Sequence, residues 1–257
     1  MKNVIEKFAR MGARLKINQT DRPVRFRANN EFRIDVLRDK NGEFFDIQTQ
    51  DIDMKVLDVQ SADRHLLLRV GDENFLCGHD ERQWFVAGVK TNAPTVKRAK
   101  EALKPLGVRS SERKNRVKGK NRIKRHNKGS IRQGEWFFVP EPDARFNANL
   151  ILRKEPLMRG NRGGGKPHIA EELVRMGGTT VYVNPRHRNG LMEKEYKKLL
   201  AETPSAKRWR WQVMKRDPRV YVRGKIRHPD HKTVKLQGWY RVEVNDEIFS
   251  ERVAFLD

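Results

Sequence analysis

The stretch HLLLRVGDENFLCGHDERQWFVAGV, residues 65–89, decides the fold class, because it contains three apolar runs separated by short polar segments. Each run has the length of a strand, so the stretch predicts two or three strands joined by turns. Just upstream, FRIDVLRD (residues 32–39) and GEFFDIQTQD (residues 42–51) are apolar-rich and flank Asn41-Gly42, a typical hairpin turn. The N-terminal part is therefore expected to be a small, mostly β module.

The following segments predict helices as well as strands. TVKRAKEALKPL, residues 95–106, begins with a capping Thr95 and ends at Pro105, and one helical face carries Val96, Ala99, Ala102 and Leu103. Residues 168–176 (HIAEELVRM) and 191–202 (LMEKEYKKLLAE) predict two more helices, the first ended by Gly177-Gly178. Strands are expected at residues 134–140, where Pro140 ends the first of them, and at residues 179–184, 208–215, 219–227 and 233–244. This mixture predicts an α+β fold with two small sheet-containing modules and a few packed helices.

The charge of the chain indicates a polyanionic partner. Its 257 residues include 56 Lys and Arg against 33 Asp and Glu, a net charge of +23, and a surface this basic attracts nucleic acid. No run of about 18 apolar residues is present to cross a membrane. The N-terminus carries Glu6 and lacks the apolar core of a secretory signal, so we expect no membrane partner. The single cysteine, Cys77, excludes an internal disulfide and a multi-cysteine zinc site and favours a reducing, cytoplasmic location.

This charge is distributed unevenly along the chain. Residues 31–81 contain 13 acidic residues and 6 Lys or Arg, a local net charge of −7, which offers a possible docking surface for a protein partner. Residues 109–132 contain 11 Lys and Arg but one acid, Glu112, and few apolar residues. Such a segment predicts a basic, partly disordered linker. We therefore divide the chain into a β module (residues 1–90), a basic helix and linker (91–132) and a basic α+β module (133–257).

A glycine-rich loop suggests phosphate binding. Gly160, Gly165 and Lys166 fit the G-x-x-x-x-G-K spacing of a nucleotide-binding loop, but Pro167 stands where a Ser or Thr should bind magnesium. This departure argues against an NTPase. If Pro167 begins a helix, the exposed amides of its first turn favour a nucleic-acid phosphate instead. The alternative is a surface loop without a ligand.

A second basic segment contains aromatic residues. Residues 207–227 hold nine Lys and Arg, one acid (Asp217) and the aromatic residues Trp209, Trp211 and Tyr221. In a strand, Trp209 and Trp211 would share one face and the arginines the other. The tryptophans then either belong to the core or, where exposed, stack on unpaired bases.

Two segments contain residue types that can perform catalysis. In CGHDER (residues 77–82), Cys77 and His79 share a strand face and could form a nucleophile and its base, although a lone cysteine is more often a core residue. In RHPDHKT (residues 227–233), His228, Asp230 and His231 could bind a divalent metal or cleave RNA by acid–base chemistry, although a Pro-Asp turn between strands explains the same residues. The scattered carboxylates Asp35, Asp46, Asp51 and Asp53 resemble the polar face of a sheet rather than a magnesium site.

The sequence thus predicts a non-enzymatic nucleic-acid-binding protein, with RNA favoured over DNA because no duplex-reading motif is present. No cofactor, metal site or catalytic residue is assigned. The alternative is a metal-dependent nuclease that uses His228, Asp230 and His231. The residues expected to contact nucleic acid are Arg113, Lys114, Arg116, Lys118, Lys120, Arg122, Lys124, Arg125, Lys128, Arg162, Lys166, Arg208, Arg210, Lys215 and Arg216.

Overall fold

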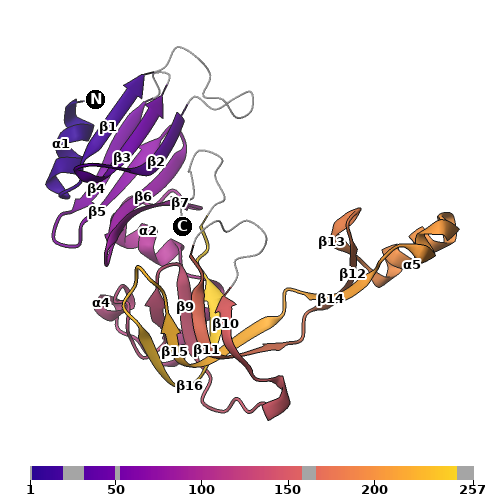
Figure 1. Cartoon of the computed structure of the whole chain (residues 1–257). Helices are drawn as coiled ribbons and strands as arrows, with labels where there is room; N and C mark the ends of the chain where they lie inside the picture. Colours follow the sequence, from indigo (N-terminus) through magenta and orange to yellow (C-terminus); the bar gives the residue numbers. More distant parts are fainter. Residues whose placement is uncertain (1, 20–31, 50–52, 158–165, 248–257) are drawn as a thin grey trace.

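The computed structural model describes residues 2–19, 32–49, 53–157 and 166–247. It is a mixed α+β structure with 49% strand, 21% helix and four sheets. Figure 1 shows two N-terminal sheets, a larger sheet below them, and a small α/β extension that projects away from both. The predicted α+β class is confirmed, whereas the predicted pair of modules joined by a disordered linker is not what the structure shows.

The N-terminal part is a two-layer β structure. One sheet has the order β1-β3-β2 and the other the order β4-β5-β6-β7, and side chains from both form one core with Phe8 and Met11. Its elements are α1 (Lys2–Arg10), β1 (Leu15–Gln19), β2 (Phe32–Asp39), β3 (Gly42–Thr49), β4 (Met54–Gln60), β5 (His65–Val70), β6 (Glu73–Asp80) and β7 (Gln83–Val89). The predicted strands of residues 32–49 and 65–89 are all present.

Strand β5 explains why the HLLL run is apolar at every position. Leu66 and Leu68 point into the core between the two sheets, while Leu67 points to the opposite face. That opposite face is covered by α2 (Val96–Ala102) through Val96, Ala99 and Leu103, as the sequence predicts. A strand buried on both faces has no polar side to alternate with its apolar side.

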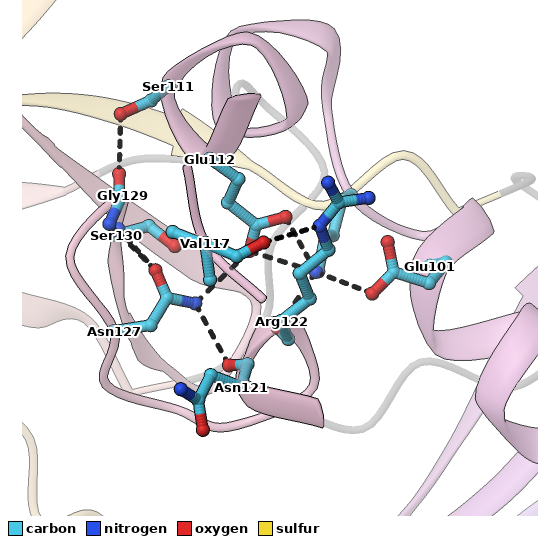
Figure 2. Close-up of polar contacts among 10 residues, drawn as sticks. Glu101, Ser111, Glu112, Val117, Asn121, Arg122, Asn127, Gly129 and Ser130 are labelled. Carbon is cyan, nitrogen blue, oxygen red and sulfur yellow. Dashed lines mark hydrogen bonds and ion pairs between the residues drawn. The ribbon is translucent and has the colours of Figure 1, made fainter. Parts of the chain in front are cut away.

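Residues 106–130 form an ordered segment, which we call the α3–α4 segment. It contains α3 (Leu106–Lys114) and the short α4 (Gly119–Arg122). Glu112, the single acid of residues 109–132, is buried and accepts hydrogen bonds from Lys104 Nζ (2.9 and 3.0 Å) and from Asn127 Nδ2 (3.1 Å). Figure 2 shows how Asn127 also ties Asn121 to the backbone of Gly129 and Ser130. The prediction of a partly disordered segment is therefore wrong here, because one buried acid organises the surrounding backbone.

A six-stranded antiparallel sheet follows in the order β10-β11-β15-β16-β9-β8. Its core contains Phe138, Leu173 and Val222, and its other face packs Phe137 against Val108 of α3. The strands are β8 (Ile131–Gln133), β9 (Trp136–Pro140), β10 (Leu152–Leu157), β11 (His168–Met176), β15 (Arg219–Arg227) and β16 (Val234–Val244), with a 3-10 turn η1 (Ala148–Leu150) between β9 and β10.

Residues 168–176 are a strand and not the predicted helix. The register between β11 and β15 shifts between Ala170 and Glu172, so Ala170 and Leu173 face the same core although they are three residues apart. Three-residue spacing is the helical signal, and the bulge produces it within a strand. Residues 168–176 form a strand because β11 pairs with β10 on one side and with β15 on the other.

The projecting extension comprises residues 177–216, and we call it the arm. It contains a sheet of order β13-β12-β14 and one helix, and Figure 1 shows it reaching outward from the ends of β11 and β15. Where the arm joins the six-stranded sheet, its two ends pass close together. A Cβ added to Gly178 would lie only 2.7 Å from the carbonyl oxygen of Arg216. The elements are β12 (Thr179–Asn184), β13 (His187–Met192), α5 (Glu193–Glu202), the 3-10 helix η3 (Pro204–Arg208) and β14 (Gln212–Arg216).

Candidate nucleic-acid interface and histidine cluster

The arm carries an excess of positive charge on exposed side chains. Its 40 residues include 10 Lys and Arg against 3 Glu. In the described part of the chain, the arm's ion pairs join Glu193 to Lys197 (2.6 Å) and Glu202 to Lys198 (3.7 Å). Six other exposed cations take part in neither pair: Arg186, Arg188, Lys194, Lys207, Arg208 and Arg210. These six side chains are therefore available to an external anion.

Aromatic side chains hold the arm together beside these cations. Trp209 and Trp211 are stacked with ring centroids 6.0 Å apart, and the ring of His187 is stacked on both. Trp211 also donates from Nε1 to the carbonyl of Ala206 (2.9 Å) and meets Tyr196 edge to face. The guanidinium of Arg186 lies 4.4 Å from the Trp209 ring centre. Both tryptophans are half-buried and precede β14, so the predicted strand over residues 208–215 begins four residues later than expected.

The predicted contact residues of the arm separate into two pairs. Arg208 and Arg210 are exposed. Lys215 donates to Thr180 Oγ1 (2.7 Å), and Arg216 donates to the carbonyls of Asn189 and Gly190 (2.5 and 2.7 Å). The second pair therefore joins strands within the arm. Sequence inspection missed Arg186 and Arg188, whose only signal is a basic NPRHRNG turn.

The predicted contact residues of the α3–α4 segment also differ in role. Arg122 donates to the carbonyl of Val117 (3.2 Å), while Arg125 forms ion pairs with Asp80 and Glu81. These two residues stabilise the fold. Exposed side chains belong to Arg113, Lys114, Arg116, Lys118, Lys120, Lys124 and Lys128.

The acidic residues 31–81 contact the basic residues 109–132 through Asp80 and Glu81, at the turn between β6 and β7. Asp80 pairs with Arg125 and with Arg132 (3.3 Å), and Glu81 Oε2 accepts from the amide of Lys232 (2.5 Å). Burial lowers the pKa of Arg125 to about 10 and also lowers that of Arg132. Part of the acidic charge of residues 31–81 is therefore paired within the chain.

The segment after the glycine-rich loop differs from the prediction. Pro167 precedes strand β11, so the helix whose first-turn amides were expected to bind a phosphate does not form there. Lys166 pairs with Asp230 (3.2 Å) on the neighbouring loop. Arg162 and the loop glycines lie outside the described residues.

Three histidines meet at one end of the six-stranded sheet, and we call them the histidine cluster. His168 begins β11, whereas His228 and His231 lie in the connection between β15 and β16. One ring nitrogen of each lies within 4.8 Å of the others, and this is the single group of three or more possible metal ligands among the residues described. The rings of His168 and His228 are stacked with centroids 4.3 Å apart. Sequence inspection found His228 and His231 but assigned His168 to a helix.

The hydrogen bonds of the cluster leave nitrogen lone pairs available. His168 is 3% exposed and its Nε2 has no hydrogen-bond partner among the described residues, and the same holds for Nδ1 of His231. Burial, together with His228 and His231, lowers the pKa of His168 to about 3, so this imidazole is neutral near pH 7. Burial also lowers the pKa of His231, with His228 as the next cause.

The cluster faces a cleft of about 310 Å³ between the N-terminal sheets and the six-stranded sheet. Apolar and charged side chains line it, including Leu37, Arg38, Glu43 and Trp84 opposite the histidines. Asp230, which the sequence grouped with His228 and His231, directs its carboxylate to Lys166 instead. The cleft therefore lies directly beside the three imidazole rings.

The remaining catalytic candidates are accounted for by packing. Cys77 is fully buried in the N-terminal core, and burial raises the pKa of its thiol, so it is no nucleophile. His79 meets Trp84 edge to face (4.9 Å). Asp35 and Asp46 are buried partners on adjacent strands, Asp53 is exposed, and Asp51 lies outside the described residues.

Within the described ranges, no helix has the length and apolar character needed to cross a membrane. Comparisons with models of protein families, with curated proteins and with solved structures find no match for this chain.

Proposed function

We propose that this protein binds nucleic acid, RNA in preference to DNA, and that the arm supplies the main contact surface. The observation that carries the proposal is the set of six exposed arm cations outside the ion pairs described above, next to a half-exposed tryptophan stack. Phosphate contacts of this kind supply most of the affinity of a non-specific complex. The stack adds a possible platform for a base, worth about 1–3 kcal/mol per stacked base.

RNA is preferred because the arm is poorly suited to the major groove of DNA. Its one helix, α5, is 10 residues long and alternates Glu193, Glu195 and Glu202 with three lysines. Those glutamates would face phosphates on both sides of a groove. Loops and single strands can instead reach the exposed arginines and Trp209 together. The seven exposed cations of the α3–α4 segment form a second surface for a longer strand.

The proposal can be tested with labelled single-stranded RNA, hairpin RNA and duplex DNA, titrated at several salt concentrations. In the arm variant, Arg186, Arg208 and Arg210 are replaced by Gln. If each contacts one phosphate, the slope of log affinity against log salt for a single strand becomes shallower by about 2.

A matched control replaces three exposed cations of the N-terminal part, Lys40, Lys55 and Lys97, by Gln. This variant loses the same charge but should retain the wild-type slope. Equal behaviour of the two variants would refute the arm as the contact surface, and a wild-type affinity that is independent of salt would refute nucleic-acid binding by the chain.

A metal-dependent nuclease is the second candidate, because a third histidine, His168, lies beside His228 and His231. The same labelled strands, incubated with Mg²⁺, Mn²⁺ or Zn²⁺, distinguish cleavage from binding. The binding proposal expects the strands to stay intact, and cleavage abolished by His231→Gln would favour the nuclease.

A further inference from the structure

We propose that His168, His228 and His231 bind a zinc-type divalent metal ion, with the open side of the metal facing the cleft. This inference is independent of the proposed nucleic-acid binding, since the cluster lies at the ends of β11 and β15 and the proposed contact surface lies on the arm.

The geometry of the cluster is close to that of a three-histidine site. Zinc bonds to imidazole nitrogen at about 2.0–2.1 Å, so three nitrogens in a tetrahedral site lie about 3.4 Å from one another. The nitrogens here lie within 4.8 Å of one another before any ion is added. The ring of His168 is stacked on those of His228 and His231, with interplanar angles of 22° and 24°. Because the lone pair of an imidazole nitrogen lies in the plane of its ring, binding one ion requires the rings to rotate out of this stack.

For His228 and His231, the second ring nitrogen lies near an oxygen atom of the protein. His228 donates from Nε2 to the carbonyl of Lys166 (2.8 Å), which leaves the Nδ1 lone pair for a metal in place of the amide of Asp230 (3.1 Å). Nδ1 of His231 makes no hydrogen bond but lies 3.5 Å from the Glu81 carboxylate, on that side of the ring, so Nε2 is the nitrogen assigned to the metal. A ligating histidine commonly donates its second nitrogen to a carbonyl or carboxylate.

The backbone at Gly134 lies close to two of the rings without placing a side chain between them. Gly134, in the turn between β8 and β9, has a φ of +58°, and a Cβ there would lie 3.0 Å from Nε2 of His231 and 3.5 Å from Nε2 of His168. Those two nitrogens therefore face the same side-chain-free position. The adjacent Gln133 donates to the carbonyl of Lys232 (2.8 Å) and so anchors the loop that carries His231.

The ligand chemistry selects the class of metal. Neutral imidazoles favour Zn²⁺ and its neighbours in the first transition row over Mg²⁺ and Ca²⁺, which prefer oxygen ligands. Three protein ligands and access to a cleft are typical of zinc sites that keep a position for water or a substrate.

The experiment is a Zn²⁺ titration of the full chain, prepared free of metal, in competition with a chromophoric chelator. We expect one high-affinity ion per chain and a rise in the unfolding temperature on adding Zn²⁺. Loss of a supporting residue around a metal usually weakens binding by roughly 10- to 100-fold, so His168→Gln, His228→Gln and His231→Gln should each weaken it by about 100-fold or more.

Two histidines serve as controls. His65 is similarly buried but lies in β5 against Phe85, and His187 lies in the arm. His65→Gln and His187→Gln should retain zinc affinity, and all three cluster variants should retain nucleic-acid affinity. A wild-type chain that binds no zinc, or cluster variants that bind it as tightly as the wild type, would overturn the proposal.

A measurement on the wild type covers the case in which His168→Gln fails to fold. Co²⁺ added to the metal-free chain should give the visible absorption of a four- or five-coordinate nitrogen-ligated ion. X-ray absorption of the zinc form should show scattering from three imidazoles. Scattering from oxygen ligands alone would refute the site.

Discussion

The α3–α4 segment and the arm are both rich in Lys and Arg, but they use these residues in different ways. Residues 109–132 contain 11 cations and one acid, and the arm contains 10 cations and three acids. In the α3–α4 segment the single acid, Glu112, is buried and organises the backbone around it. In the arm the three acids are exposed, two of them pair with lysines of the same helix, and the other eight cations are outside those pairs.

This difference shows that the position of one acid matters more than the charge density of a segment. Glu112 lies one turn from Val108, which packs against Phe137 and Val139 of the large sheet. This apolar contact anchors α3. Lys104 and Asn127 then donate hydrogen bonds to the Glu112 carboxylate and so connect the two ends of the segment. Four predictions test this comparison, beginning with the largest expected effect.

Replacement of Lys104 by Met should cause the largest loss of stability. Glu112 would remain buried without its cation, and breaking a buried ion pair in this way costs about 3–5 kcal/mol. The free energy of unfolding, measured in urea, gives the loss directly. Glu112→Gln should cost less, because Lys104 keeps Glu101 at 2.7 Å.

The double variant Lys104→Met/Glu112→Leu provides the internal control for this pair. It removes both charges together, so it should recover much of the stability lost in Lys104→Met. If Lys104→Met unfolds no more easily than the wild type, the buried pair does not organise the α3–α4 segment.

The second prediction concerns the contact between the acidic turn and the basic segment. Asp80→Asn keeps the shape of the side chain but removes the charge shared by Arg125 and Arg132. A hydrogen bond to a charged partner contributes about 1.5–3 kcal/mol, and the loss should fall in that range. Asp63→Asn is the matched control, because Asp63 is half-exposed and pairs only with Lys100 among the described residues. Equal losses in the two variants would show that burial of the arginines adds nothing.

How far the sequence predicts this structure depends on whether the signal is local. Thr95 and Pro105 bracket α2, and Asn41-Gly42 marks the first hairpin, so these elements follow from neighbouring residues. The fold of the α3–α4 segment depends on hydrogen bonds that Lys104 and Asn127 both donate to the Glu112 carboxylate. The formation of β11 depends on a β-bulge and on pairing with two other strands. Those contacts have no signature in a short window of sequence.

The candidate sites show the same limit. His228 and His231 are three residues apart and were found together, whereas His168 precedes them by some sixty residues and joins them only through the pairing of Ile169 with Arg227. Arg208 and Arg210 were found from their basic surroundings, but that both side chains are exposed is shown only by the structure.

The third prediction uses a strained position in the α3–α4 segment. Helix α3 ends with the amide of Val117 donating to the carbonyl of Glu112 (2.9 Å), which places Arg116 in the left-handed region at a φ of 50°. Glycine is favoured there, since a side chain costs about 1–2 kcal/mol. After the greater freedom of glycine in the unfolded chain is subtracted, Arg116→Gly should stabilise the protein by about 0.5–1 kcal/mol. Arg116→Ala removes the same charge but keeps a Cβ, so a gain in that variant would attribute the effect to charge.

The smallest effect on the free energy of unfolding is expected in the arm, where the ion pairs are exposed to solvent. Lys198 and Glu202 are separated by 3.7 Å and are both mostly exposed, and the lysine precedes the glutamate, which is the weaker order along a helix. Lys198→Gln should therefore change the free energy of unfolding by at most about 0.5 kcal/mol. The measurement is urea unfolding at low and high salt, and screening should remove whatever difference is present. A loss as large as that of Lys104→Met would mean that the ion pairs of the arm are structural, and the distinction between the two basic segments would fail.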